Sequence, residues 1–172
     1  MNKTPRQIAF HEAGHTAIQL VFDQTPEHVT LTPKDGALAH ASHLDGDRDS
    51  EEGLRKLVIN CYAGREAELR VGGDGSGSWQ DDEEALDYLR LLGVEEEEMR
   101  RATADCVTEH WPLIERIAEE LLEHTTLIFE ELECLLGIYR EEETEEELKA
   151  LRSEQMFDIF LPGIKAKGLE RT

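Results

Sequence analysis

Two histidines four residues apart, with a glutamate beside the first, are the residues of this sequence best suited to chemistry. The segment reads His11-Glu12-Ala13-Gly14-His15. On an α-helix, side chains four positions apart lie on the same face, so His11 and His15 can present two imidazoles to one metal ion. Glu12 lies one position further round, where it can accept a proton from an attacking water. This HExxH pattern predicts zinc-dependent hydrolysis of peptide bonds.

The two histidines leave zinc one protein ligand short of the three that are usual in catalytic sites. A third histidine on the same helix is not available, since Ile18 and Val21 stand where the extended pattern requires glycine and histidine. The third ligand must therefore come from another part of the chain. Spacing alone does not choose it among 39 acidic residues and the other five of the seven histidines.

The helix that carries the HExxH segment has a clear beginning. Thr4 suits the N-cap, Pro5 the first helical position and Gln7 the third, which together form a capping box. Apolar residues then follow on almost every face, as in a helix buried within a domain core. The small residues between the two histidines, among them Gly14, allow a neighbouring element to pack closely against the metal-binding face.

The remaining pattern predicts a mainly α fold with a small two-stranded β element. Short strands are expected near Val29 and over residues 37–44, joined by a turn at 34–36. A flexible glycine-rich loop covers residues 72–78. Helices are expected over residues 51–71, 78–92, 95–123 with a restart at Pro112, and 126–139, and a last helix from the acidic run 141–147 to Phe160.

Composition restricts the classes of partner and the compartment. The 172 residues suffice for one domain with its own core. The formal charge of −21, from 18 basic and 39 acidic residues, opposes nucleic acid and favours basic or neutral peptides. No apolar run approaches the roughly 20 residues of a membrane-spanning helix, so no membrane partner is expected. Three widely spaced cysteines (Cys61, Cys106 and Cys134) and the lack of a signal segment favour a cytoplasmic location.

The segment IAFHEAGHTAI, around the two histidines, resembles the protease-domain signature of the FtsH family of ATP-dependent zinc metalloproteases. The resemblance continues in the family's order. HVTLTPKDGALAHASHL resembles its two-stranded segment, and INCYAGREAELRVGG its helix with the Gly-Arg-x-Ala-Glu pattern. GSGSWQDDEEAL resembles its glycine-serine loop and following aspartate, and ELLEHTTLIFEEL its final helical hairpin. The resemblance covers about residues 5–138 and implies an FtsH-peptidase-like zincin helical domain that binds Zn²⁺.

In the resembled family, the aspartate after the loop completes the zinc shell. Counting back four positions from Ala85, as the family pattern does, assigns this role to Asp81, with Asp82 as the neighbouring alternative. An acidic residue at this place has another use, because Ser78 and Asp81 also suit a helix capping box.

Five further residues carry two interpretations each. Glu68 and Arg65, in the glycine-arginine helix, either orient the metal ligands or form an ion pair that packs the helix. His40 or His43 can assist the oxyanion, although a surface position is the simpler interpretation. Trp79 is expected in the core rather than as a platform for substrate.

The sequence also departs from the resembled family. No ATPase module precedes the histidines, the stretch over residues 91–104 looks shorter and more acidic, and residues 140–172 have no counterpart. We therefore expect a zinc metallopeptidase-like domain over residues 1–139 and an acidic helical extension over 140–172.

The predicted function is a stand-alone, ATP-independent zinc metalloendopeptidase that acts on peptides or unfolded chains, with Glu12 as the catalytic residue. One alternative is a catalytically idle binding or regulatory module. Another is a peptidase that depends on a separate partner. The resemblance also admits a homo-oligomer, since the family works as rings.

Overall fold

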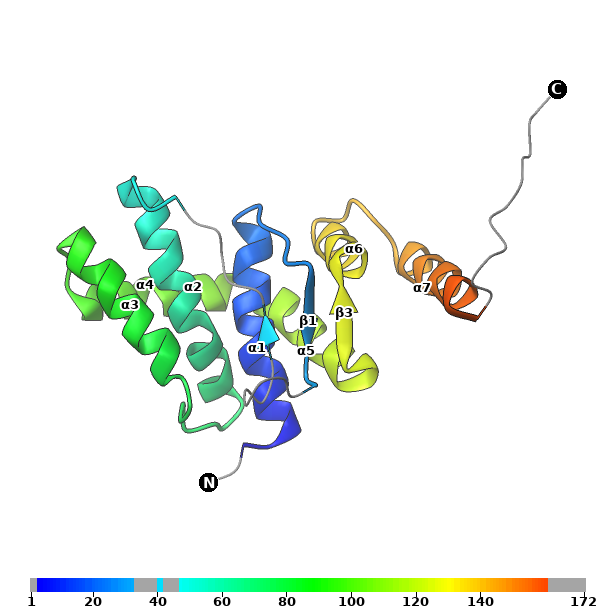
Figure 1. Ribbon diagram of the computed structural model, residues 1–172, viewed down its shortest axis with the longest axis horizontal. Helices are drawn as coiled ribbons and strands as arrows, with labels where there is room; N and C mark the ends of the chain where they lie inside the picture. Colours follow the sequence, from blue (N-terminus) through cyan, green and yellow to red (C-terminus); the bar gives the residue numbers. More distant parts are fainter. Residues whose placement is uncertain (1–2, 33–39, 42–46, 161–172) are drawn as a thin grey trace.

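The computed structural model describes residues 3–32, 40–41 and 47–160. Helix α1 (Pro5–Val21) runs through the middle of the molecule and contacts α2 (Glu51–Arg70) on one side and α5 (Trp111–His124) on the other (Figure 1). The helices α3 (Trp79–Leu92) and α4 (Glu96–Glu109) pack against α2. This arrangement places α1, which carries both histidines, between two other helices.

The opposite end of the molecule consists of α6 (Phe129–Tyr139) and α7 (Glu145–Phe160), which lie far from α3 in Figure 1. Helix α7 packs on α6, and its Leu148 is buried in the same core as α1. The described part of the acidic extension is therefore docked on the domain rather than separate from it.

A small antiparallel sheet lies beside α1. Its strands are β1 (His28–Thr30), β2 (His40–Ala41) and β3 (Thr126–Ile128), in the order β2-β1-β3. The expected mainly α fold with a small β element is confirmed, and β3 adds a strand to the two expected. Of the strand expected over residues 37–44, only the two residues of β2 are among those that the structure describes.

Helix α1 begins as its sequence indicates. The Thr4 hydroxyl accepts a hydrogen bond from the Gln7 backbone, and the Gln7 side chain accepts one from the Thr4 backbone. Every residue from Ala9 to Leu20 is buried. A Cβ atom at Gly14 would lie 2.6 Å from the Ala63 carbonyl oxygen, so α1 and α2 make their close approach at this glycine. The small residues between the two histidines were expected to let another element pack closely against this helix, and the approach of α2 confirms it.

The helical stretch over residues 95–123 restarts at Pro112, as expected. It forms two helices, which meet at His110, and the Pro112 ring suits the first turn of α5. Residues 126–128, expected to be helical, form β3 instead. Here Thr125 adopts a positive φ of 67°, and the next three residues pair with β1. Tertiary pairing prevails over the helical pattern because the strand completes the sheet beside α1.

Trp79 corrects a further expectation, because 64% of its surface is exposed and it lies outside both core clusters. The buried side of α3 carries Ala85, Tyr88 and Leu89, which leaves the first residue of the helix facing solvent. All three cysteines are free, and Cys61 and Cys134 are buried, as expected of small core residues; Cys106 is partly buried.

Among the described residues, no helix combines the length with the apolar character that a membrane span requires.

Candidate metal centre

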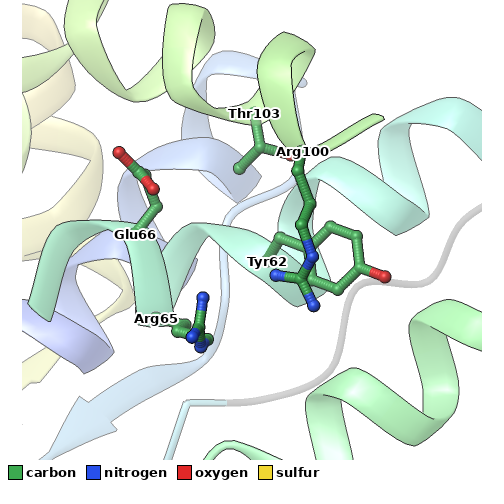
Figure 2. A pocket seen from close by; sticks show the side chains of 5 residues that line it. All are labelled: Tyr62, Arg65, Glu66, Arg100 and Thr103. Carbon is green, nitrogen blue, oxygen red and sulfur yellow. The ribbon is translucent and has the colours of Figure 1, made fainter. Parts of the chain in front are cut away.

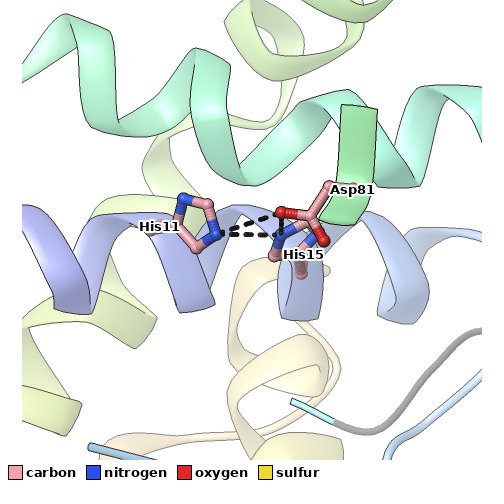
Figure 3. A group of neighbouring side chains, drawn as sticks. All are labelled: His11, His15 and Asp81. Carbon is pink, nitrogen blue, oxygen red and sulfur yellow. Dashed lines mark hydrogen bonds and ion pairs between the residues drawn. The ribbon is translucent and has the colours of Figure 1, made fainter. Parts of the chain in front are cut away.

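Three side chains from two helices converge on one point (Figure 3). His11 and His15 project from successive turns of α1, and Asp81 reaches them from the first turn of α3. The Nε2 atoms of the two histidines lie 3.3 Å apart. Asp81 Oδ2 lies 3.5 Å from His11 Nε2 and 3.7 Å from His15 Nε2. The three atoms thus form a nearly equilateral triangle.

The triangle has the dimensions that a zinc ion requires. With bonds of about 2.0–2.1 Å, neighbouring ligand atoms of a tetrahedral zinc site lie roughly 3.3–3.4 Å apart. The spacings of 3.3, 3.5 and 3.7 Å are close to this value. Two imidazole nitrogens and one carboxylate oxygen also form the kind of three-ligand set found in catalytic zinc sites. The residues therefore fit zinc.

Asp81, rather than its neighbour, is directed at the histidines. Asp82 accepts a hydrogen bond of 3.1 Å from the Arg100 guanidinium. The alternative capping role is also not taken, because the Ser78 side chain makes no capping hydrogen bond. Burial raises the pKa of Asp81, but hydrogen bonds from His11 and His15 outweigh it and hold that pKa well below its usual range. The distances thus favour Asp81 as the third ligand.

The orientation of His15 is set by the backbone of α2. Its Nδ1 lies 2.8 Å from the carbonyl oxygen of Asn60. A carbonyl can only accept, so Nδ1 carries the hydrogen and the Nε2 lone pair faces His11 and Asp81. Gly64 makes room for this ring, because a Cβ atom there would lie 2.3 Å from His15 Nε2.

The orientation of His11 is set by a side chain instead. Its Nδ1 lies 3.3 Å from Oε2 of Glu68, which is fully buried and also lies 2.6 Å from Lys3 Nζ. Burial lowers the pKa of His11, but hydrogen bonds to Asp81 and Glu68 outweigh it and raise the pKa to about 9.

These contacts bear on the two interpretations of Glu68 and Arg65. Within the described residues, the two do not form an ion pair with each other. The Arg65 side chain instead lies against the glycine-rich loop at Gly75. The contact with His11 favours a ligand-orienting role for Glu68 and gives Arg65 no such role.

Glu12 is buried beside the triangle, with 8% of its surface exposed. No described residue forms a hydrogen bond or ion pair with its carboxylate. The negative charge of Glu12 also contributes to the raised pKa of His11. A carboxylate next to these three side chains, without a structural partner among the described residues, is suited to exchange protons with a water molecule.

A small cavity lies between α2 and α4, apart from the His11, His15 and Asp81 triangle. It has a free volume of about 50 Å³ and contains neither Glu12 nor any of the three converging residues. On one side, the Arg100 guanidinium lies 4.0 Å from the centre of the Tyr62 ring. Figure 2 shows its lining, which consists of Tyr62, Arg65, Glu66, Arg100 and Thr103. This cavity is therefore not part of the metal centre.

The residues expected from the sequence and the residues found near the triangle do not coincide fully. The oxyanion role considered for His40 or His43 cannot be placed, because His43 and the His40 side chain lie outside the described residues. Conversely, the sequence pattern did not single out Lys3 or the Asn60 carbonyl. Lys3 is 65 positions from Glu68, and a backbone carbonyl contributes no residue type to a motif.

The structure thus combines a mainly helical fold with a possible His-His-Asp metal site. The chain is similar to the ATP-dependent zinc metalloprotease FtsH 1 of Salinibacter ruber (strain M8), with 28% identity over 181 aligned residues. The alignment covers 77% of this chain and 26% of the relative, so the chain spans about a quarter of the relative's length. No family model matches the chain. The similarity supports a relationship to FtsH metalloproteases.

Proposed function

We propose that this chain is a zinc-dependent endopeptidase in which His11, His15 and Asp81 hold the metal and Glu12 transfers the proton. The observation that carries the proposal is the triangle of His11 Nε2, His15 Nε2 and Asp81 Oδ2, with sides of 3.3–3.7 Å. The similarity to a zinc metalloprotease supports it. Activity in the absence of ATP and of any partner is part of the proposal.

When bound, zinc lowers the pKa of a water molecule toward about 7 and polarises the peptide carbonyl. The Glu12 carboxylate accepts a proton from the attacking water, whose oxygen bonds to the carbonyl carbon. Glu12 then donates that proton to the leaving amine nitrogen as the carbon–nitrogen bond breaks. The Asn60 carbonyl and Glu68 hold His15 and His11 in the orientation that this chemistry needs.

The substrates proposed are short peptides, loose tails and unfolded chains, because none of these requires prior unfolding. Strand β2 is at the edge of the described sheet and contacts α1. An extended peptide added along this edge would be held by backbone hydrogen bonds, which leave its amide bonds accessible.

The proposal is tested by measuring bound zinc and cleavage of an unstructured peptide pool, without ATP, for the native chain and Glu12→Gln. We expect about one zinc per chain in both, and a loss of cleavage of at least about 100-fold in Glu12→Gln, because the variant lacks the proton acceptor. Glu27→Gln, a substitution of an exposed glutamate, is the matched control and should cleave like the native chain.

The outcomes separate the alternatives. Zinc in both proteins without cleavage in either favours an idle binding module. Cleavage that appears only when a separate ATPase is added favours dependence on a partner. A native chain that holds no zinc, or a Glu12→Gln variant as active as the native chain, contradicts the proposal.

A further inference from the structure

The Glu68 carboxylate is stabilised through one of its two oxygens. Oε2 lies 2.6 Å from Lys3 Nζ and 3.3 Å from His11 Nδ1, whereas the buried Oε1 has no hydrogen-bond partner. A fully buried carboxylate is costly unless a positive group or hydrogen-bond donors compensate its charge. Lys3 therefore supplies the only full positive charge that the described residues place on Glu68 when His11 is neutral.

The two histidines differ in how firmly their Nδ1 atoms are held. The partner of His15 is the backbone carbonyl of Asn60, within helix α2, which cannot turn away on its own. The partner of His11 is the Glu68 side chain, whose rotatable bonds allow other positions. A ligand oriented by a flexible group depends on whatever holds that group in place.

The glycine-rich loop encloses the Lys3–Glu68 contact. A Cβ atom at Gly73 would lie 2.4 Å from Glu68 Cγ, and one at Gly77 would lie 3.6 Å from Lys3 Nζ. Both side chains are thus covered, with 11% of the Lys3 side chain exposed and none of Glu68. Little water is available to replace the ammonium group, and a charge-assisted hydrogen bond is stronger in such surroundings.

From these contacts we infer that Lys3 is a positioning residue of the metal centre, acting on His11 through Glu68. The inference rests on the proposed metal site. Lys3 neutralises Glu68, so the two positive charges of a bound zinc are matched by Asp81 and Glu12 alone. Without Lys3, the buried Glu68 carboxylate lacks a compensating charge and leaves its position on His11 Nδ1, so the His11 ring loses its fixed orientation.

The test compares the native chain with Lys3→Met, which keeps the length of the side chain and removes the charge. We expect zinc to leave Lys3→Met about tenfold faster, the lower end of the effect of losing an outer-shell partner. The visible absorption spectrum of the cobalt-substituted protein should also change, because it reports the geometry of the metal ligands. Lys3→Arg should restore both properties, since it returns a positive donor to Glu68.

A matched control is Lys56→Met, because Lys56 pairs with Glu52 at 2.7 Å on the exposed face of α2. It should match the native chain in both measurements. Melting of the metal-free proteins, followed by circular dichroism, shows that each variant is folded before metal is added.

Three results overturn the inference. The first is a folded Lys3→Met variant with native zinc release and a native cobalt spectrum. The second is tighter zinc binding with an unchanged spectrum, which would give Lys3 an electrostatic role alone. The third is a native chain that holds no zinc, which overturns the proposed function as well and is thereby distinguished from the other two.

Discussion

Gly64 controls how closely α2 approaches the metal centre. A Cβ atom at this position would lie 2.3 Å from His15 Nε2, 2.6 Å from His15 Cδ2 and 2.9 Å from the His11 carbonyl oxygen. We therefore predict that Gly64→Ala lowers the affinity for zinc at least about tenfold, since a displaced ligand weakens the whole site. Competition with a chromophoric chelator measures this affinity.

The matched control for that substitution is Gly137→Ala in α6. The three heavy atoms nearest to its added Cβ would all belong to the Glu143 side chain, and α6 lies far from α3 (Figure 1). Its zinc affinity should equal that of the native chain. A Gly64→Ala protein that binds zinc normally would show that His15 is not held as described.

Zinc binding should depend on pH through His11. In the metal-free protein, burial lowers the His11 pKa, but hydrogen bonds to Asp81 and Glu68 outweigh it and raise the pKa from 6.5 to about 9. A protonated imidazole cannot bind metal, so the apparent affinity should fall by up to about tenfold for each pH unit below 9. Above that pH the dependence on His11 should vanish.

Nuclear magnetic resonance of the imidazole nitrogens checks this prediction directly. In the metal-free native chain, His11 should titrate near pH 9. In Asp81→Asn, its pKa should move toward 6.5, because the strongest of the hydrogen bonds that raise it is weakened. Titration of native His11 near pH 6.5 would refute the description of these contacts.

At the level of residues, the sequence predicted the part of the site that lies on one helix. The spacing of His11, Glu12 and His15, together with the capping box, required only local rules. Asp81 needed a resemblance, because 66 positions separate it from His15 and many other acids compete with it. Lys3 could not be predicted, since its role depends on how the chain folds over Glu68 rather than on any local pattern.

At the level of elements, an ion-pair network joins α5, α6 and α7. Arg152 on α7 lies 2.7 Å from both Glu120 on α5 and Glu131 on α6, and both glutamates are buried. Arg116 contacts Glu120 at 2.9 Å and Glu145 at 2.7 Å. Buried carboxylates depend on such partners, so the network fastens α7 to the rest of the domain.

We predict that Arg152→Met lowers the free energy of unfolding by about 2 kcal/mol. The loss is smaller than for a fully buried pair, because Arg116 remains beside Glu120 and the Arg152 side chain is partly exposed. Urea denaturation followed by circular dichroism measures the change.

Arg101→Met is the control, because Arg101 and Glu97 form an exposed ion pair on α4. It should change the free energy of unfolding by less than about 0.5 kcal/mol. Equal losses in the two variants would mean that the network contributes no more than a surface ion pair.

Prediction of the elements succeeded where a helix pattern was long and its start was marked. Helix α1 begins at its expected capping box, and α2 and α3 fall within one residue of their expected ends. Prediction was wrong at 126–128, where strand pairing with β1 decides the conformation. The partner strand is nearly a hundred residues away, so no local pattern contains that information.

At the level of the whole molecule, the charge of −21 should influence which peptides reach the site. We predict that a lysine-rich peptide is cleaved about tenfold more efficiently than a glutamate-rich version of the same sequence at low salt, because a negative field attracts cations. Raising the salt concentration from about 0.05 to about 0.5 M should narrow the difference in kcat/KM through screening.

Equal rates for the two peptides at low salt would mean that the site is shielded from the net charge.

The cytoplasmic location, the homo-oligomer and the division at residue 139 stay predictions from the sequence. The packing of Leu148 in the main core shows, however, that the residues on both sides of that division share one core.

The central claim is that His11, His15 and Asp81 bind one zinc ion beside Glu12. Its most direct test is anomalous diffraction at the zinc edge from crystals of the native chain grown with zinc. The account predicts one strong peak per chain, within bonding distance of His11 Nε2, His15 Nε2 and Asp81 Oδ2. No peak at this position, or a peak whose third ligand is Asp82 or another acid, would contradict it.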